Sequence, residues 1–449
     1  MIQKEKIMKR VKFFWLALLL LFTSCITKME ENIGHTVITK WQGDKRSAIS
    51  ITYDDGIINQ FTVARPIMNK LGLPGTFFIL TGKIDGSGKA KFIGRPKAEI
   101  IMETASFKTN SDNFFERASL IGFTGTSEAL EYHSNAGSLF ESGNITAAYE
   151  VIDKGYEQIR SGKLKNTDEV IFHNNPVDTT SWNDLKIYAA EGHEIASHTV
   201  THSRLAVLDH DNLLYELEQS KADILNFLGK KYTFSAECPY GTENERVMEY
   251  AHKVYPALRN QMPEAYLDEL NRSSKRQPGE SKKEYVQWQR GPLSNVSMDV
   301  MKSWVDTCIT YDNIWLVLVF HGIDGIGWES RTGAELEEYF SFMLEKEPYL
   351  WIATFADVTK YIRERKNTVI NSAVRDDIIV VKLSSNLDSE IYDIPITLKT
   401  YVPKVWKTAV LNKETMQDDD SSLKILKDDL GPYVLYDVMP GELEIILSE

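Results

Sequence analysis

Cysteine is scarce in this sequence. Three cysteines occur in 449 residues, at Cys25, Cys238 and Cys308. So few cysteines exclude a disulfide-rich scaffold. If Cys25 serves another purpose, Cys238 and Cys308 either form one disulfide or remain buried free thiols, and only geometry decides between these alternatives.

The chain also lacks an excess of positive charge. Its 51 Lys and Arg residues are outnumbered by 64 Asp and Glu residues, which gives a net charge of -13. An acidic chain repels phosphate backbones, so nucleic acid is not an expected partner. After residue 22 no apolar run reaches the length of a membrane span. With 43% hydrophobic residues, the chain can still build a large core in two or three domains.

The N-terminus has the pattern of a processing signal. A basic start precedes the apolar run FFWLALLLLF at residues 13–22, and small residues follow. Ser24 and Cys25 resemble a bacterial lipobox, in which the cysteine is lipidated. We therefore expect residues 1–24 to be a lipoprotein signal peptide and Cys25 to carry a membrane anchor. The expected location is the cell envelope, on either face of the outer membrane, and a simple secreted or membrane-anchored form is the alternative.

Strand and helix patterns alternate over residues 46–365. Segments with helical periodicity separate apolar or β-rich runs at residues 47–53, 74–80, 193–197, 232–236, 315–320 and 349–353. This alternation predicts an α/β domain with a parallel sheet. A deformed (β/α) barrel is the favoured fold, and an open doubly wound sheet is the alternative. Residues 95–180 interrupt the alternation with helical spacing, which predicts a helical insertion.

The two ends of the chain are predicted to be different. Residues 25–45 are expected to be a tether. From residue 366 to residue 449 the helical period disappears and short β-rich segments alternate with turns, which predicts a small all-β, sandwich-like accessory domain. This domain either binds sugar through Tyr401 or Trp406, or acts as a spacer.

Two segments suggest a metal site. TYDDG at residues 52–56 places two neighbouring carboxylates, Asp54 and Asp55, where Gly56 allows the strand to break. Two carboxylates so close together raise one pKa unless a cation is near. In HTVTH, His198 and His202 have the i, i+4 spacing that puts two metal ligands on one face of a helical turn. Taken singly, the same segments also fit a solvated turn and two unrelated histidines.

Two further segments follow predicted strands. ECPYG at residues 237–241 either aims a backbone N–H and the Tyr240 ring into a pocket or, taken singly, is a plain turn. In LVFHG at residues 318–322, His321 directly follows an apolar strand, where it is suited to proton transfer or is simply a buried core histidine. Parallel α/β folds build their sites at the carboxyl ends of strands, so all four segments point to one site.

Together, and in this order, the four segments resemble the polysaccharide deacetylase family, also called the NodB-homology family or carbohydrate esterase family four. TYDDG is similar to its T-F-D-D-G motif, and HTVTH to its H-S/T-x-x-H motif. ECPYG is similar to R-x-P-Y, and LVFHG to L-x-H. The resemblance covers about residues 45–365, and it implies a deformed barrel with a divalent metal.

The resemblance also implies a role for each matched residue. The implied metal ligands are Asp55, His198 and His202, with Zn²⁺ expected first and Co²⁺, Ni²⁺ or Mn²⁺ as alternatives. The implied catalytic groups are Asp54 as general base, His321 as general acid, and the backbone N–H of Tyr240 at the oxyanion. The implied reaction is hydrolysis of acetyl groups from a polysaccharide, with N-acetylated amino-sugar glycans favoured. The alternatives are an O-acetyl esterase of xylan-like glycans and a glycan-binding surface protein that has lost turnover.

The sequence departs from the family pattern in two motifs. Glu237 stands where the family has an arginine that pairs with the catalytic aspartate, and Arg259 and Arg290 are candidates to replace it. The family's Asp-Trp motif has only weak candidates, Trp304 and Asp306. The helical insertion lengthens the spacing between the first two motifs, and it either lines a substrate groove or is purely structural.

Overall fold

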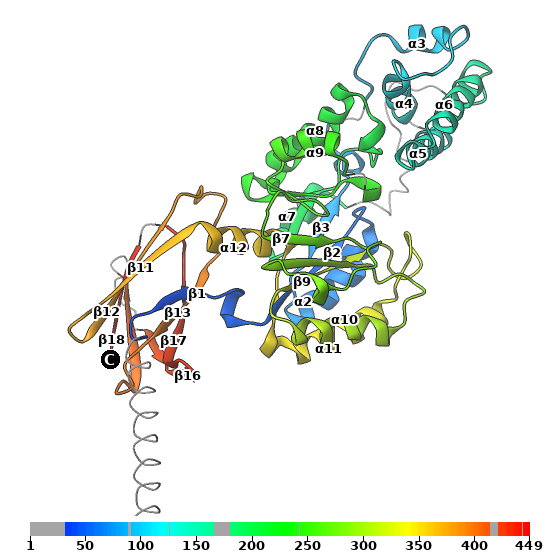
Figure 1. The fold of residues 1–449 in the computed structure, drawn as a ribbon. Helices are drawn as coiled ribbons and strands as arrows, with labels where there is room; N and C mark the ends of the chain where they lie inside the picture. The colour runs from blue at the N-terminus through cyan, green and yellow to red at the C-terminus, as the bar shows by residue number, and fades with distance from the viewer. Residues whose placement is uncertain are drawn as a thin grey trace, which may run out of the picture. The chain divides into compact units, whose positions relative to one another are not determined.

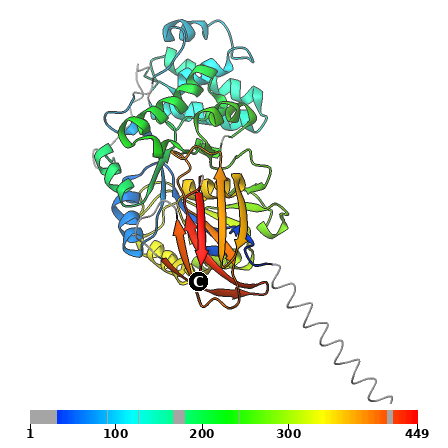
Figure 2. The same cartoon turned by 90° about the vertical axis from the view of Figure 1, so that its left-hand side faces the viewer.

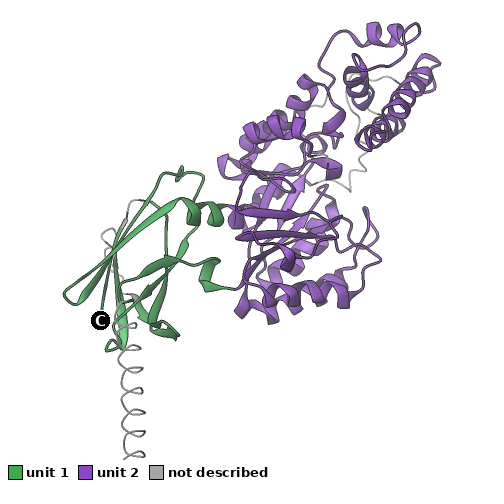
Figure 3. Ribbon diagram, viewed as in Figure 1, with its two compact units in different colours: residues 1–45, 360–449 green, residues 46–359 purple. Residues whose placement is uncertain are grey.

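The computed structural model describes residues 32–88, 91–124, 126–165, 180–241, 243–413, 421–441 and 443–449. The predicted signal peptide and Cys25 lie outside these residues. The chain divides into two compact units, one of residues 1–45 and 360–449 and one of residues 46–359 (Figure 3). Within the described ranges, no helix is both long and apolar enough to cross a membrane.

Unit 2, residues 46–359, is built on one parallel sheet (Figure 1). Its strands are β2 (Ser47–Tyr53), β3 (Thr76–Ile79), β4 (Glu194–Ser197), β5 (Ser235–Ala236), β6 (Ala257–Leu258), β7 (Leu267–Leu270), β8 (Tyr285–Arg290), β9 (Ile314–Phe320) and β10 (Leu350–Ile352). The order is β6-β5-β4-β3-β2-β9-β8-β7, and β10 pairs with the start of β2. This is the strand order of a barrel, and across the described part of the chain the ring stays open between β6 and β7. The predicted deformed (β/α) barrel is confirmed in this open form.

Helices connect successive strands and cover the sheet. They are a π-helix (Gln60–Ala64), α2 (Arg65–Leu71), α7 (Trp182–Ala190), α8 (His210–Leu228), α9 (Glu245–Val254), α10 (Met298–Thr310) and α11 (Gly333–Glu345). All seven residues of β2 and all seven of β9 are buried. Strands buried on both faces need an apolar side chain at nearly every position, which is why WLVLVF reads as a continuous apolar run.

The predicted helical insertion is confirmed over its described residues. It contains α3 (Lys97–Glu103), α4 (Phe114–Gly122), α5 (Ser127–Glu141) and α6 (Ile145–Arg160). These helices gather at the end of unit 2 away from α10 and α11 (Figures 1 and 2). They share a core of their own around Phe114, Ile121 and Ile152. Residues 166–179 of the predicted insertion lie outside the described residues.

Unit 1 contains two antiparallel sheets, ordered β1-β13-β17-β16 and β11-β12-β18-β14-β15. Helix α12 (Phe355–Asn367) runs into it, and its strands are β1 (Thr36–Ile38), β11 (Thr368–Arg375), β12 (Ile378–Ser385), β13 (Ile396–Tyr401), β14 (Thr408–Lys413), β15 (Ser421–Lys424), β16 (Leu426–Asp428), β17 (Gly431–Val438) and β18 (Leu443–Ser448). The prediction of an all-β C-terminal region is confirmed.

The predicted tether, residues 25–45, is wrong over its described part, because the alternating TVI segment forms β1 and pairs in register with β13. Of the two roles left open for this unit, packing or spacing is favoured over sugar binding, because Tyr401 and Trp406 are only 5% and 7% exposed. The Tyr401 hydroxyl donates to Asp428 at 2.9 Å, so this ring is fixed within the unit.

The two cysteines of unit 2 are buried free thiols, which decides between the alternatives left by the sequence. Cys238 follows β5, and Cys308 lies on α10. Burial raises the pKa of both thiols. Both therefore stay protonated and unreactive in the core.

Candidate active site

The register of the sheet sets Asp54 beside His321. Tyr53 of β2 pairs with Phe320 of β9, so the residues that follow them are neighbours. The Asp54 backbone N–H donates to the Phe320 carbonyl at 3.0 Å. Gln60 joins the two strand ends, because its side-chain amide donates to the carbonyl oxygens of Asp54 at 2.6 Å and His321 at 2.8 Å.

The same relationship holds among β4, β5 and β6, which pair in register at their last residues. The residues that follow these three strands, His198, Glu237 and Arg259, therefore lie side by side. Carboxyl ends of parallel strands meet at one edge of a sheet. The six predicted catalytic and metal-binding residues, Asp54, Asp55, His198, His202, Tyr240 and His321, all line one pocket.

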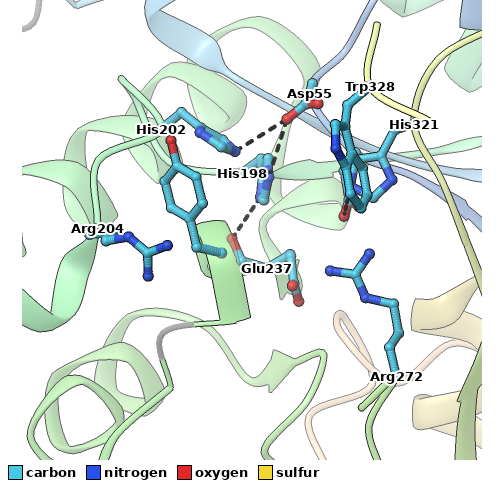
Figure 4. Close-up of a pocket in the computed structure, with 10 residues that line it drawn as sticks. Asp55, His198, His202, Arg204, Glu237, Arg272, His321 and Trp328 are labelled. Carbon is cyan, nitrogen blue, oxygen red and sulfur yellow. Dashed lines mark hydrogen bonds and ion pairs between the residues drawn. The ribbon is translucent and has the colours of Figure 1, made fainter. Parts of the chain in front are cut away.

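The three predicted metal ligands form one cluster (Figure 4). Asp55 Oδ1 lies 3.6 Å from His198 Nε2 and 3.2 Å from His202 Nε2. His198 Nδ1 lies 3.0 Å from the Glu237 carbonyl oxygen, so this nitrogen donates and Nε2 is left as the acceptor. Burial lowers the pKa of His198 to about 4, which keeps the ring neutral at physiological pH. Two imidazole nitrogens and one carboxylate oxygen are donors that suit Zn²⁺.

The predicted helical turn at HTVTH is wrong. Residues 198–204 form an irregular turn, with left-handed φ values of 70° at Thr199 and 67° at His202. A buried carboxylate holds this turn together: Glu216 Oε2 of α8 accepts the N–H groups of Val200 at 2.8 Å and Thr201 at 2.9 Å. The histidines therefore converge because Glu216 organises the backbone, and not because a helix repeats every 3.6 residues.

Asp54 pairs with Arg259 deep in the site. The Arg259 guanidinium donates two hydrogen bonds to the Asp54 carboxylate, at 2.8 and 2.6 Å. Burial alone would raise the pKa of Asp54, but the charges of Arg259 and His321 outweigh it and hold this pKa well below its usual range. Arg259 also lies 3.0 Å from Glu237 Oε1, and burial raises the pKa of Glu237. The single cation therefore favours an ionised Asp54 over an ionised Glu237.

Arg259 fills the role that Glu237 leaves open. Of the two arginines proposed from the sequence, Arg259 contacts Asp54, whereas Arg290 stacks on Trp288, 4.5 Å from the ring centroid. Both Glu237 and Arg259 are almost completely buried. Removing the cation would therefore leave two buried carboxyl groups without a guanidinium beside them.

His321 is held between Asp54 and an aromatic ring. Its Nε2 lies 3.5 Å from Asp54 Oδ2. Its ring packs edge-to-face against Trp328, with the ring centroids 4.7 Å apart. Burial lowers the pKa of His321. A tight loop places Trp328 there: a Cβ on Gly322 would lie 2.7 Å from the Gly327 backbone, so only glycine allows this approach.

Left-handed backbone conformations concentrate at the site. Asp55 has a φ of 77° and Tyr240 a φ of 64°. Such conformations cost non-glycine residues about 1–3 kcal/mol each and cluster at functional sites. The break at Asp55 lets two consecutive carboxylates line one pocket, whereas a continuing strand would point them to opposite faces.

The pocket has a volume of about 510 Å³ and is lined by Asp54, Asp55, His198, His202, Arg204, Glu237, Tyr240, Arg272, His321 and Trp328. A neighbouring cavity of about 340 Å³ shares Asp55, His202 and Tyr240 with it. Leu130, His133 and Ser134 of α5 line this second cavity, so the insertion forms part of the groove wall.

Sequence reasoning missed three residues of the pocket and proposed two that lie elsewhere. Arg204, Arg272 and Trp328 sit in loops without a recognisable pattern. Trp304 packs against the core and Asp306 is exposed on α10, and neither lines the pocket. They do not replace the family's Asp-Trp motif.

Comparison with known families bears on this site directly. Residues 140–258 match the family model described as polysaccharide deacetylase. The matched stretch is well under half of the chain, and it includes His198, His202 and Glu237. Asp54 and His321 lie outside it, and the register of the sheet brings them to the same pocket.

A curated protein that resembles this chain is only distantly similar to it. A protein named gellan lyase, from a Bacillus species, is 27% identical over 248 residues, which cover 51% of this chain and 10% of that protein. The chain thus spans about a tenth of the length of this curated relative.

Solved structures similar to this chain include two family 4 carbohydrate esterases. The one from Bacillus anthracis is 14% identical, with 76% of this chain and 92% of that chain covered and a TM-score of 0.32. The one from Streptomyces lividans is 10% identical, with 70% and 95% covered and a TM-score of 0.33. At such scores the likeness to these structures carries no argument.

Proposed function

We propose that this chain is a metal-dependent hydrolase that releases acetate from an acetylated polysaccharide. One observation carries the proposal: an ionised, buried carboxylate, Asp54, lies in the same pocket as the Asp55–His198–His202 cluster. The match of residues 140–258 to the deacetylase family supports the substrate class.

The donor set fits a divalent cation, with Zn²⁺ favoured over Co²⁺, Ni²⁺ or Mn²⁺. Asp55, His198 and His202 would hold it, and the Glu237 carbonyl keeps His198 in the tautomer that a ligand needs. When bound, such a cation polarises an acetyl carbonyl and lowers the pKa of a water molecule.

The remaining residues handle protons and charge. Asp54 stays ionised at physiological pH and accepts the proton of the attacking water. The low pKa of Asp54 makes its carboxylate a weak base. It can therefore deprotonate only a water molecule whose own pKa is lowered. The Tyr240 backbone N–H stabilises the negative charge that develops on the acetyl oxygen. Asp54 passes the proton of the water to His321 Nε2, 3.5 Å away, and His321 gives it to the leaving amine or hydroxyl group as acetate is released.

Two alternatives use the same pocket. An O-acetyl esterase of xylan-like glycans needs the same groups. Whether an ester or an amide bond is cleaved therefore depends on which acetylated glycan is the substrate. The alternative of a binding protein without turnover is motivated by Glu237. Arg259 argues against this alternative, because it supplies Asp54 with the guanidinium that Glu237 lacks.

The proposal also includes a membrane anchor. The basic, apolar and small-residue order of residues 1–24, with Cys25 next, supports lipidation of Cys25 and a place in the cell envelope. A polysaccharide of the envelope or the surroundings would be accessible there.

The test is acetate release by the purified chain with added zinc or cobalt. The panel holds N-acetylglucosamine oligomers, peptidoglycan, acetylated xylan and, because of the gellan lyase relative, acetylated gellan. Release that disappears in His198→Ala supports the proposal, and the preferred glycan separates amide from ester cleavage. No release from any glycan by a chain that has bound metal would favour the binding-protein alternative.

A further inference from the structure

Almost every ionisable side chain that lines the pocket has a partner within the protein. Asp54 has Arg259, Asp55 has two histidines, and Glu237 accepts hydrogen bonds from Arg259 and Asn260. Arg204 donates to Glu141 Oε2 at 2.6 Å and lies 4.3 Å from the centroid of the Tyr240 ring. Arg272 is different: it makes no hydrogen bond or ion pair with any other residue that the structure describes.

The position of Arg272 makes this free charge relevant to the substrate. It follows β7 by two residues and lines the same cavity as the catalytic groups. Its guanidinium points into the cavity, toward His321 and Trp328, from the side opposite Arg204 (Figure 4). Burial lowers the pKa of His321, and the positive charge of Arg272 lowers it further, so the field of Arg272 reaches the reacting centre.

The surroundings define what this guanidinium can bind. Its planar fork of N–H donors matches a carboxylate with two parallel hydrogen bonds. The chain as a whole carries a net charge of -13, so long-range electrostatic attraction does not draw acidic polymers to it. An acidic group on the substrate would have to be recognised locally, by an unpartnered cation such as Arg272. A cavity of about 510 Å³ is in the size range of small-molecule sites, with room for a sugar beside the acetyl group.

We propose that Arg272 binds a carboxylate of the substrate, so that the preferred glycan carries a uronic acid close to the acetyl group. This inference rests on the proposed function for the site, and it adds the class of glycan. Arg272 is then a specificity-determining residue. Arg204, tied to Glu141 and stacked on Tyr240, forms the opposite wall.

Binding without turnover tests this inference. The probes are a glucuronoxylan oligosaccharide without acetyl groups, which cannot be hydrolysed, and the same oligosaccharide with its uronate carboxyl converted to an amide. Dissociation constants for the full, zinc-loaded chain are measured by titration calorimetry. We expect the acidic probe to bind about tenfold more tightly than the amide, the usual effect of one charge-assisted hydrogen-bonded contact.

Two variants locate the effect. Arg272→Gln is expected to bind both probes equally, and Arg272→Lys to recover part of the preference, because lysine keeps the charge but not the fork. The matched control is Arg276→Gln, which removes an exposed arginine of the same segment that pairs with Asp268 outside the pocket. This control is expected to keep the full preference.

Three results would overturn the inference: equal affinity of the unmodified chain for both probes, no measurable affinity for either, or an equal loss in Arg272→Gln and Arg276→Gln. Acetate release from acetylated glucuronoxylan is measured in parallel. If the preference for the acidic probe is present but no acetate appears, the inference about Arg272 stands and the proposed hydrolase activity fails.

Discussion

Arg259 holds Asp54 by two hydrogen bonds, at 2.8 and 2.6 Å, from the end of β6. The polysaccharide deacetylase pattern places such an arginine where this chain has Glu237, at the end of β5. Because β5 and β6 pair in register at their last residues, the two positions are neighbours. The guanidinium of this chain therefore comes from the end of the neighbouring strand and still contacts the same carboxylate.

Replacing Arg259 with glutamine is predicted to destabilise the protein strongly. The change leaves Asp54 and Glu237 buried without a cation, and breaking a buried ion pair costs about 3–5 kcal/mol. The exchange Glu237→Arg with Arg259→Glu restores the family arrangement and should recover at least half of the lost free energy of unfolding. Urea denaturation measures both. A double variant no more stable than Arg259→Gln alone would show that the two positions are not interchangeable.

Glu237→Gln is predicted to have little effect on acetate release. Burial already raises the pKa of Glu237, so a neutral amide resembles the favoured form of this group. The expected loss of stability is below about 1 kcal/mol, since volume and shape are kept. Initial rates of acetate release from the best glycan check this. A large gain in rate would mean that the Glu237 carboxylate suppresses turnover, as the binding-protein alternative requires.

His198→Ala and His202→Ala are each predicted to weaken metal binding. Each removes one of three protein ligands, and even loss of a residue that only orients a ligand costs about 10–100-fold in affinity. The zinc content after equilibration at a fixed free zinc concentration is the measurement. His210→Ala, an exposed histidine at the start of α8, is the control and should bind metal as the unmodified chain does. Equal zinc contents in all chains would contradict the proposed ligand set.

His321→Gln is predicted to lower kcat by about 10²–10⁴-fold, the usual contribution of a general acid. Metal content should not change, because His321 is outside the ligand cluster. Rates and zinc content are measured on the same preparation. A loss of both would assign His321 to the metal site.

The predictable parts of the fold are those with long periodic segments. β2 is a seven-residue β-rich run and β9 a seven-residue apolar run, so their ends, and with them Asp54 and His321, follow from the sequence. β6 has two residues and no pattern, and for that reason the position of Arg259 beside Asp54 could be named only as one of two candidates. Strand register then decided between them.

Other parts of the site depend on contacts between distant segments. The turn at HTVTH is shaped by hydrogen bonds to the Glu216 carboxylate of helix α8. The spacing of the two histidines does not reveal this contact. Arg272 and Trp328 lie in loops whose paths are set by packing and by close glycine contacts. Spacing rules assume regular secondary structure, so they failed where tertiary contacts shape the backbone.

Stability is predicted to fall below about pH 6.5 because of His133. This buried ring donates from Nδ1 to the Ala118 carbonyl and accepts the Arg204 backbone N–H at Nε2, an arrangement that only neutral imidazole can make. Burial lowers its pKa to about 4 in the folded state, whereas the unfolded value is about 6.5. Between these values the unfolded chain takes up a proton and the folded chain does not. The stabilisation is therefore present above pH 6.5 and lost as the pH falls, by up to about 3 kcal/mol.

Melting temperatures from pH 7.5 to 4.5 check this, with His133→Gln as the matched variant. The unmodified chain should be the more stable at pH 7.5, and the difference should shrink toward pH 4.5. A constant difference across this range would show that His133 does not titrate with folding.

The central claim, a metal-dependent deacetylase centre at Asp54, Asp55, His198 and His202, is tested most directly by a zinc titration of acetate release. The chain is first stripped with a chelator, and zinc is then added stepwise in the presence of the preferred acetylated glycan. Acetate release should be absent from the stripped chain and should rise to a plateau at one zinc per chain. Acetate release that persists after chelation, or no release at any zinc concentration, would contradict the account.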